Sequence, residues 1–294
     1  MIKVIKVIAV IGIICGGLYA AYWGYVVYQW GQHLPNTTIN VNGVERNYYV
    51  YLPTEKSAKP MPLIMLLHGS GSGHYRFPQQ FRLEDLAEKE GIILALPVAK
   101  KLLTNEGEWQ LNTDAESMQD IDFIEAVIDD VSASHAVALN RVYALGYSMG
   151  SMFSYEIACG HTRRFAAIAS YAGSMPITPK SCEPARNIPL MHIHGVQDSI
   201  IAYETSWDWK SWGSVGKMHD IPALVQYWGE KYKCKNRTES ESNTSAHILY
   251  DSCDQNAAVE LHRIDAAEHG WPDNINGVST HEVIWSFLSN YSRP

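Results

Sequence analysis

The stretch Arg141-Val-Tyr-Ala-Leu-Gly-Tyr-Ser-Met-Gly150 gives the strongest indication of the fold, because it joins a strand-like run to a helix-like run at a single serine. Residues 142–145 are apolar strand formers, and residues 151–159 have the pattern of a helix. The intervening Gly146-Tyr-Ser-Met-Gly150 fits G-x-S-x-G, a corner that holds a serine hydroxyl at the tip of a sheet. Glycines are needed because the serine backbone is strained and nearby side chains would collide with the neighbouring strand and helix.

The helix that follows Ser148 predicts half of an oxyanion-binding site. Backbone N–H groups at a helix N-terminus are free to donate, so the N–H of Met149 is expected to point at negative charge that develops beside the serine. The alternative interpretation is a Gly/Ser turn that arises by chance, since the bare pattern occurs in many proteins. The strand before the turn and the helix after it favour the functional interpretation.

A glycine-rich loop supplies the second half of the predicted oxyanion site. The unbroken apolar run 63–67 is typical of a strand covered on both faces, and it ends in His68-Gly-Ser-Gly-Ser-Gly73. A phosphate-binding loop would end in Lys followed by Ser or Thr, but His74-Tyr75 stand there. We therefore predict an oxyanion loop whose donor is the N–H of Ser70, with Gly71 as the alternative.

Apolar and amphipathic segments alternate along the chain and predict a mostly parallel central sheet with helices on both faces. An Asn-Gly turn inside residues 38–52 predicts a preceding hairpin. The predicted strands are 63–67, 92–96, 142–145, 165–172, 188–193, 246–250 and 259–264. The predicted helices are 81–90, 120–133, 151–159, 221–232 and 279–291.

A nucleophilic serine needs a base, and the base needs an acid that fixes its tautomer. In this architecture the three groups follow successive strands in the order serine, acid, histidine. His269 is the predicted base, because it lies after the last predicted strand in a loop bounded by Gly and Pro. Asp198 is the predicted acid, because it follows the strand that ends near residue 193 in a tight turn; the alternatives are Asp265 and a simple turn-capping role for Asp198.

The other histidines are weaker candidates for the base, because they fall within predicted regular elements. His192 and His194 lie in or at the end of a buried strand, whereas three others fall in later strands or the last helix. These three are His247, His262 and His281.

The N-terminus differs in composition from the rest of the chain. Residues 7–21 carry no charge and are long enough, with their flanks, to cross a hydrocarbon core. Aromatic residues crowd the far end of this run, while Lys3 and Lys6 precede it, a pattern that predicts an N-inside transmembrane anchor over residues 1–30. A cleaved signal peptide is the alternative, although a small-x-small cleavage site is poorly formed. Residues 31–37 are then a linker and residues 38–294 one catalytic domain on the non-cytoplasmic side.

Charge and cysteine content narrow the class of protein further. The net charge is −8 without a basic run, which argues against nucleic acid as a partner. Beyond Cys15 there are four cysteines, and an even number in an exported domain predicts two disulfides. Of the three possible pairings we favour Cys159–Cys182 with Cys234–Cys253. No C-x-x-C or His/Cys cluster predicts a metal site, no cofactor is expected, and the oligomeric state is left open.

Taken in order, these motifs resemble those of α/β-hydrolase serine esterases of the polyhydroxybutyrate-depolymerase and feruloyl-esterase type. The resemblance covers about residues 47–291. It rests on Leu67-His-Gly-Ser70, Asp120-Ile-Asp-Phe-Ile124, Arg141-Val-Tyr143 with Gly146-Tyr-Ser-Met-Gly150, Ile193-His-Gly-Val-Gln-Asp198, Tyr203, His269-Gly-Trp-Pro272 and Ile284-Trp-Ser-Phe287.

The resemblance implies an α/β-hydrolase fold and ester cleavage outside the cytoplasm through an acyl-enzyme. In that reading Ser148 is the nucleophile, His269 the base and Asp198 the acid. Family members are usually secreted, so the predicted anchor is a departure from the family. A serine peptidase of the same fold and an inactive tethered binding protein are the alternative functions.

Aromatic residues close to these motifs are candidates to line the substrate pocket. For Trp271 the alternative is packing of a lid against the domain. The candidates are Tyr147, Trp109, Tyr203 and Trp271.

Overall fold

The computed structural model describes residues 19–22, 24, 36–55, 57, 59–70, 82–99, 109–112, 118–208 and 215–294. The chain divides into two compact units, Met1–Pro35 and Asn36–Pro294. In the first unit only residues 19–22 and 24 are described, as helix, so the predicted anchor lies almost wholly outside the described residues. Across the described ranges, no helix combines the length and the apolar character that a bilayer crossing requires.

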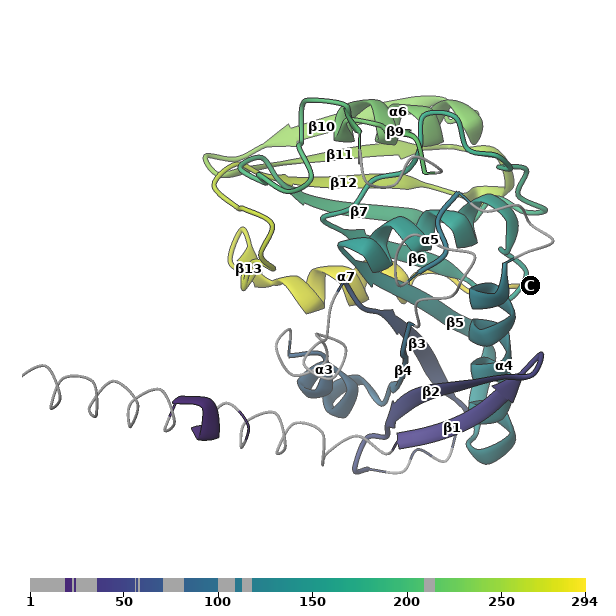
Figure 1. Ribbon diagram of the computed structural model, residues 1–294. Coiled ribbons are helices and arrows are strands. Elements are labelled where there is room, and N and C mark those ends of the chain that lie inside the picture. Colours follow the sequence, from purple (N-terminus) through teal and green to yellow (C-terminus); the bar gives the residue numbers. More distant parts are fainter. Residues whose placement is uncertain are drawn as a thin grey trace, which may run out of the picture. The chain divides into compact units, whose positions relative to one another are not determined.

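The second unit is built on a ten-stranded sheet, whose strands are labelled in Figure 1. Its strands are β1 (Asn36–Val41), β2 (Val44–Tyr51), β3 (Met61–Leu67), β4 (Ile93–Pro97), β5 (Val137–Tyr147), β6 (Ala167–Tyr171), β7 (Leu190–Gly195), β10 (Asn236–Glu241), β11 (Ser245–Asp251) and β12 (Val259–Ile264). The spatial order is β1-β2-β4-β3-β5-β6-β7-β12-β11-β10. The strands from β4 to β12 in this order are parallel, and antiparallel pairs extend both edges.

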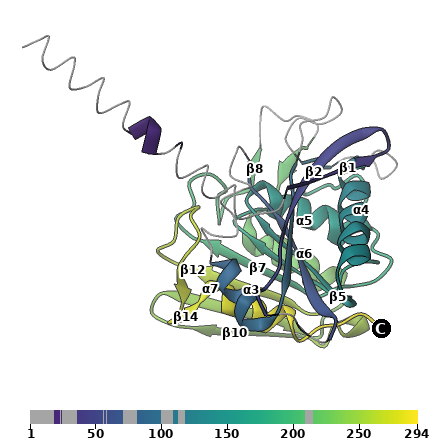
Figure 2. The same cartoon turned by 90° about the horizontal axis from the view of Figure 1, so that it is seen from below.

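Helices cover both faces of this sheet, as Figure 2 shows from below. They are α3 (Leu83–Glu90), α4 (Gln119–Ser134), α5 (Met149–Gly160), α6 (Ile221–Lys231) and α7 (Thr280–Leu288). Buried residues of α4, α5 and α6 form one hydrophobic cluster with alternate residues of β3, such as Leu63 and Met65. The helices α3 and α7 contact each other and cover the other face. The prediction of a mostly parallel α/β sheet is therefore confirmed.

Local sequence explains where several elements begin and end. The hairpin of β1 and β2 closes through Asn42-Gly43, and both residues have positive φ, as a tight hairpin turn requires. Helix α3 ends at Gly91 in the left-handed conformation, and α6 begins at Asp220, whose carboxylate accepts the N–H of Ala223 at 2.9 Å. Strand β1 starts at Asn36, two residues before the predicted start of the hairpin.

The sequence prediction missed β10, because Asn236–Glu241 contains no apolar residue and is exposed throughout. This strand pairs with β11 at the edge of the sheet, where charged side chains discourage pairing with another chain. Four further two-residue strands form small ribbons outside the main sheet. They are β8 (Trp207–Asp208), β9 (Lys217–Met218), β13 (Asn274–Ile275) and β14 (Val278–Ser279).

Two disulfides join neighbouring segments of the second unit. Cys159 at the end of α5 is bonded to Cys182, and Cys234 after α6 is bonded to Cys253 before β12. This is the sequence-local pairing, and each bond closes a short loop. Disulfides of this kind are typical of proteins that fold in an oxidising compartment.

A buried ion pair fixes the first turn of α4 to β2. Arg46 and Asp120 are almost fully buried and approach to 2.7 Å, and the guanidinium lies 4.0 Å from the centre of the Phe123 ring. The second oxygen of Asp120 accepts the N–H of Gln110, whose side chain in turn accepts the N–H of Asp120. Burial raises the pKa of Asp120, against the opposing effect of Arg46. Asp120 therefore needs Arg46 and the Gln110 N–H to remain ionised in the protein interior.

We expect Arg46→Met to lower the free energy of unfolding by about 3–5 kcal/mol, because it leaves a buried carboxylate without its cation. Urea unfolding at neutral pH measures this loss. The matched control is Arg82→Met, which breaks an exposed pair with Asp85 and should cost no more than about 1 kcal/mol. Equal losses in the two variants would contradict the prediction.

Candidate active site

Ser148 lies at the corner between β5 and α5 in a strained backbone conformation, with φ 54° and ψ −117°. A Cβ added to Gly146 would lie 2.2 Å from the carbonyl oxygen of Gly150, and one added to Gly150 would lie 1.9 Å from that of Leu67. Any other residue at either glycine would push α5 away from the sheet. The two glycines thus allow the helix to start directly behind the serine, as the sequence predicted.

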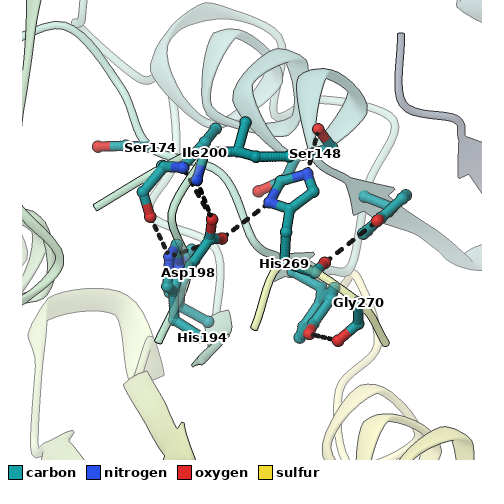
Figure 3. A network of polar contacts seen from close by, with 12 residues as sticks. Ser148, Ser174, His194, Asp198, Ile200, His269 and Gly270 are labelled. Carbon is teal, nitrogen blue, oxygen red and sulfur yellow. Dashed lines mark hydrogen bonds and ion pairs between the residues drawn. The ribbon is translucent and has the colours of Figure 1, made fainter. Parts of the chain in front are cut away.

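The structure brings together the three residues predicted to react (Figure 3). His269 Nε2 lies 2.9 Å from Ser148 Oγ, and His269 Nδ1 lies 2.8 Å from Asp198 Oδ2. The three residues follow β5, β7 and β12, whose carboxyl ends meet at one edge of the sheet. The imidazole is 16% exposed and the carboxylate is fully buried, so the histidine remains open to a ligand while its acid is shielded.

Asp198 is held as a carboxylate by a set of donors. Burial opposes its ionisation, but the neighbouring His194 and His269 side chains and the Ile201 N–H outweigh that cost and hold the pKa well below its usual range. Its Oδ1 accepts the N–H groups of Ile200 at 2.9 Å and Ile201 at 2.8 Å. Its Oδ2 is left to face the imidazole of His269. This carboxylate can orient the ring and stabilise its protonated form.

His192 and His194, the rival candidates for the base, lie behind Asp198 in a buried chain of hydrogen bonds. His194 Nε2 donates to the carbonyl oxygen of Ile201 at 2.9 Å and lies 3.3 Å from Asp198 Oδ2, as Figure 3 shows from close by. His194 Nδ1 must then accept from His192 Nε2 at 3.0 Å, so His192 Nδ1 accepts from Tyr155 at 2.7 Å. Burial holds the pKa of His192 well below its usual range. Both rings are therefore structural partners of the acid rather than bases that reach Ser148.

The loop after β3 passes directly beside Ser148. A Cβ added to Gly69 would lie 3.2 Å from the Cβ of Ser148, so the backbone there approaches as closely as a glycine allows. His68 Nε2 accepts the N–H of Ala99 at 3.0 Å, which leaves Nδ1 to donate to the Gly69 carbonyl oxygen at 2.6 Å. In a trans peptide the following N–H, that of Ser70, points the opposite way from this carbonyl. Gly71, the alternative donor, lies outside the described residues.

Met149, the other predicted donor, is the first residue of α5 and is buried. The serine's own N–H is already engaged, because it donates to the carbonyl oxygen of Tyr171 at 2.8 Å. The N–H of Met149 belongs to the first turn of the helix, where intrahelical acceptors are lacking. Its role as an oxyanion donor stays a prediction.

Two tyrosines anchor the loop that carries His269. The hydroxyl of Tyr147 donates to the carbonyl oxygen of His269 at 3.1 Å, and that of Tyr171 donates to the carbonyl oxygen of Gly270. The two rings stack at 5.6 Å, and Trp271 packs edge-on against Tyr171 at 5.0 Å. Burial and the charge of Asp198 raise the pKa of Tyr147 to about 12, so it remains a donor. Sequence reasoning did not identify Tyr171; its position at the end of β6 was the available signal.

Trp109 and Tyr203 differ from the sequence expectation for pocket residues. Trp109 is fully buried, stacks on Phe153 at 4.7 Å and donates from its indole N–H to the carbonyl oxygen of His68. It therefore holds the loop after β3 in place and has no surface exposed to a ligand. Tyr203 is also buried and lies against His194, with ring centres 6.0 Å apart. Tyr147 and Trp271 are only partly buried, beside His269.

Known proteins with similar sequences are esterases. A bifunctional acetylxylan esterase/xylanase of Neocallimastix patriciarum is 21% identical over 85% of this chain and 34% of its own length. Feruloyl esterase B of Piromyces equi is 22% identical over 63% of this chain and 34% of its own length. "Probable feruloyl esterase C" of Aspergillus niger is 29% identical over 87% of both chains. This chain spans about a third to a half of the length of the first curated relatives that it matches.

Solved structures agree on the fold. The acetyl xylan esterase from Aspergillus awamori superposes with a TM-score of 0.64 over 87% of this chain and 98% of its own, at 13% identity. A thermostable esterase superposes with a TM-score of 0.55 over 89% of this chain and 64% of its own, at 15% identity. At these identities the likeness establishes an α/β-hydrolase fold and no more.

The family itself is established by a sequence match over residues 46–218. This span includes Ser148 and Asp198 and ends before His269. His269 reaches them because β12, which precedes it, pairs with β7. The match covers more than half of the chain. The protein belongs to the esterase PHB depolymerase family.

Proposed function

We propose that this protein is a serine esterase that hydrolyses carboxylic esters through an acyl-enzyme. The observation that carries the proposal is the continuous contact from Ser148 Oγ through His269 to Asp198, with distances of 2.9 and 2.8 Å. Membership of an esterase family supports the same reaction class. A serine hydroxyl becomes nucleophilic only with such a base and acid in reach.

In the proposed mechanism, Ser148 Oγ attacks the ester carbonyl while His269 Nε2 takes its proton. The tetrahedral oxyanion is held by the N–H groups of Met149 and Ser70. His269 then gives its proton to the leaving alcohol, which departs and leaves an acyl group on Ser148. A water molecule, deprotonated by His269, attacks this ester, and the acid product leaves as the proton returns to Ser148. Asp198 keeps the proton of neutral His269 on Nδ1 and stabilises the charged ring throughout.

Labelling with a fluorophosphonate, together with hydrolysis of p-nitrophenyl acetate, tests this proposal. We expect one phosphonate per chain on Ser148, found by peptide mass spectrometry, and loss of ester turnover in proportion to labelling. An aminoacyl-amide substrate in parallel separates an esterase from a serine peptidase of the same fold. Absence of both labelling and turnover would instead favour an inactive binding protein.

We further propose that the substrates belong to the acetyl, feruloyl and hydroxyalkanoate ester class. The names of the relatives, feruloyl and acetylxylan esterases, support this range. Tyr147 and Trp271 are the proposed aromatic contacts for the bound ester, since both lie partly exposed beside the imidazole. A panel of p-nitrophenyl acetate, 3-hydroxybutyrate and ferulate esters ranks these groups by kcat/KM.

Substitution of Gly69 tests the oxyanion loop. We expect Gly69→Ala to lower kcat by about 10- to 100-fold with little change in KM, because the new Cβ meets Ser148 and Tyr147 and shifts the Ser70 N–H. Steady-state kinetics with p-nitrophenyl acetate measures the effect. Gly160→Ala is the control, since a Cβ there meets nothing within 4 Å. An unchanged kcat for Gly69→Ala would remove this loop from the oxyanion site.

Residues 1–30 are proposed to anchor the protein in a membrane with the catalytic domain, residues 38–294, on the non-cytoplasmic side. The uncharged run with its basic start and aromatic end supports the anchor. The two disulfides support an oxidising compartment. Alkaline carbonate extraction of membranes should leave the protein in the pellet. Release into the supernatant, with an N-terminus beyond residue 20, would establish a cleaved signal peptide instead.

A further inference from the structure

A second group of titratable side chains lies on β11 and β12, apart from the candidate active site. His247 on β11 is directly opposite His262 on β12, and Glu260 precedes His262 by two residues. Residues two apart on a strand, and cross-strand partners, point to the same face of a sheet. Leu261, between Glu260 and His262, points to the opposite face of the sheet. It pairs with His192, so that face carries the hydrogen-bonded histidines behind Asp198.

The three side chains converge on one point. Glu260 Oε1 lies 2.9 Å from His247 Nε2 and 2.8 Å from His262 Nε2. The two imidazoles are stacked, with centres 4.6 Å apart and planes inclined by 14°. One ligand atom from each of the three residues lies within 4.8 Å of the other two. This is a two-nitrogen, one-oxygen donor set.

Hydrogen bonding does not satisfy this group. His262 Nε2 donates to Glu260 Oε1, whereas His247 Nε2 is buried and, among the described residues, makes no well-aligned hydrogen bond, although the same oxygen lies 2.9 Å away. A proton on His247 Nε2 would be poorly directed, and a lone pair there would face a carboxylate oxygen. A cation among the three donor atoms relieves each of these conflicts.

We propose that His247, Glu260 and His262 bind a divalent transition-metal ion, with Zn²⁺ as the best match. Imidazole and carboxylate ligands suit Zn²⁺, Co²⁺, Ni²⁺ and Cu²⁺, whereas Mg²⁺ and Ca²⁺ prefer oxygen alone. Zinc bonds of about 2.0–2.2 Å in a tetrahedral arrangement place ligand atoms about 3.3 Å apart. The two nitrogen–oxygen separations, 2.8 and 2.9 Å, need to open by about 0.5 Å, and the two stacked rings need to tilt so that each lone pair points at the ion.

The exposure of the group leaves an entry path and an open coordination position. The side chain of His247 is 37% exposed, whereas those of Glu260 and His262 are 17% and 12% exposed. A metal ion can therefore enter past the His247 side chain when its rotation uncovers the buried Nε2, and can keep a water molecule on that side. Since β12 leads into the loop of His269, a bound ion would brace the hairpin that supports this loop.

Zinc titration of the full, tag-free chain after EDTA treatment tests the site. We expect one Zn²⁺ per chain by isothermal titration calorimetry, a rise in melting temperature, and the visible spectrum of tetrahedral Co²⁺ when cobalt replaces zinc. His247→Ala and His262→Ala should each weaken Zn²⁺ binding at least about tenfold, and Mg²⁺ should not compete.

Controls separate this site from other histidines and from misfolding. His135→Ala should bind Zn²⁺ as the parent does, and His269→Ala should also retain the site, which excludes binding at the candidate triad. Circular dichroism and melting in EDTA establish that the His247 and His262 variants are folded. A dissociation constant weaker than about 1 mM, or equal affinity in parent and both hairpin variants, would overturn the proposal. Neither result bears on the esterase reaction.

Discussion

Ser148→Ala is expected to lower kcat for p-nitrophenyl acetate by about 10⁵- to 10⁶-fold while the protein stays folded. Loss of the nucleophile removes the acyl-enzyme route altogether, and only binding and the oxyanion donors remain to speed attack by water. The fold should survive because alanine accommodates the backbone angles of residue 148 as serine does. The one hydrogen bond lost, to His269, is worth about 1 kcal/mol.

The measurement needs protein free of contaminating esterase, so kinetics should be paired with fluorophosphonate labelling of the same sample. Ser132→Ala is a matched control, because within the described part of the chain its hydroxyl bonds to the carbonyl oxygen of Ile128 in its own helix and to no other group. Its turnover and labelling should equal those of the parent. Turnover in Ser148→Ala within tenfold of the parent would remove Ser148 from the mechanism, and with it the proposed function.

Asp198→Asn should lower kcat by about 10⁴-fold, because it forces His269 into the wrong tautomer. The amide oxygen must take the place of Oδ1, since that position accepts the N–H groups of Ile200 and Ile201. The amide NH₂ then occupies the place of Oδ2 and donates to His269 Nδ1. The remaining proton of the ring moves to Nε2, where it points at Ser148 Oγ and blocks the base.

Asp265→Asn is the control for this prediction, because Asp265 was the alternative acid in the sequence. In the structure Asp265 accepts from Arg263 at 2.8 Å and lies on the segment after β12, not against His269. Activity should be retained within a factor of about three. A loss in Asp265→Asn that matches or exceeds the loss in Asp198→Asn would reverse the assignment of the acid. Thermal unfolding of both variants checks that the fold is intact.

Local patterns were sufficient for most of the fold. Apolar runs such as 63–67 and 92–96 predicted buried strands, because the side chains of a strand that is covered on both faces are all buried and therefore mostly apolar. The Asn42-Gly43 turn predicted its hairpin, since both residues tolerate positive φ. Asn236–Glu241 gave no such signal, because an edge strand that is exposed on both faces needs no apolar residue.

Backbone strain and local periodicity fix the strand–turn–helix corner at Ser148 and its two glycines, so the chain alone was enough to predict them. Which distant segments meet depends instead on how the whole sheet packs. The pairing of β12 with β7 brings His269 to Asp198, and the register of β11 on β12 brings His247 to Glu260 and His262. The burial of Trp109 likewise depends on tertiary packing. The sequence of one strand does not show which distant strand it will pair with. Packing of the whole sheet determines both the neighbouring strand and the register of the pair.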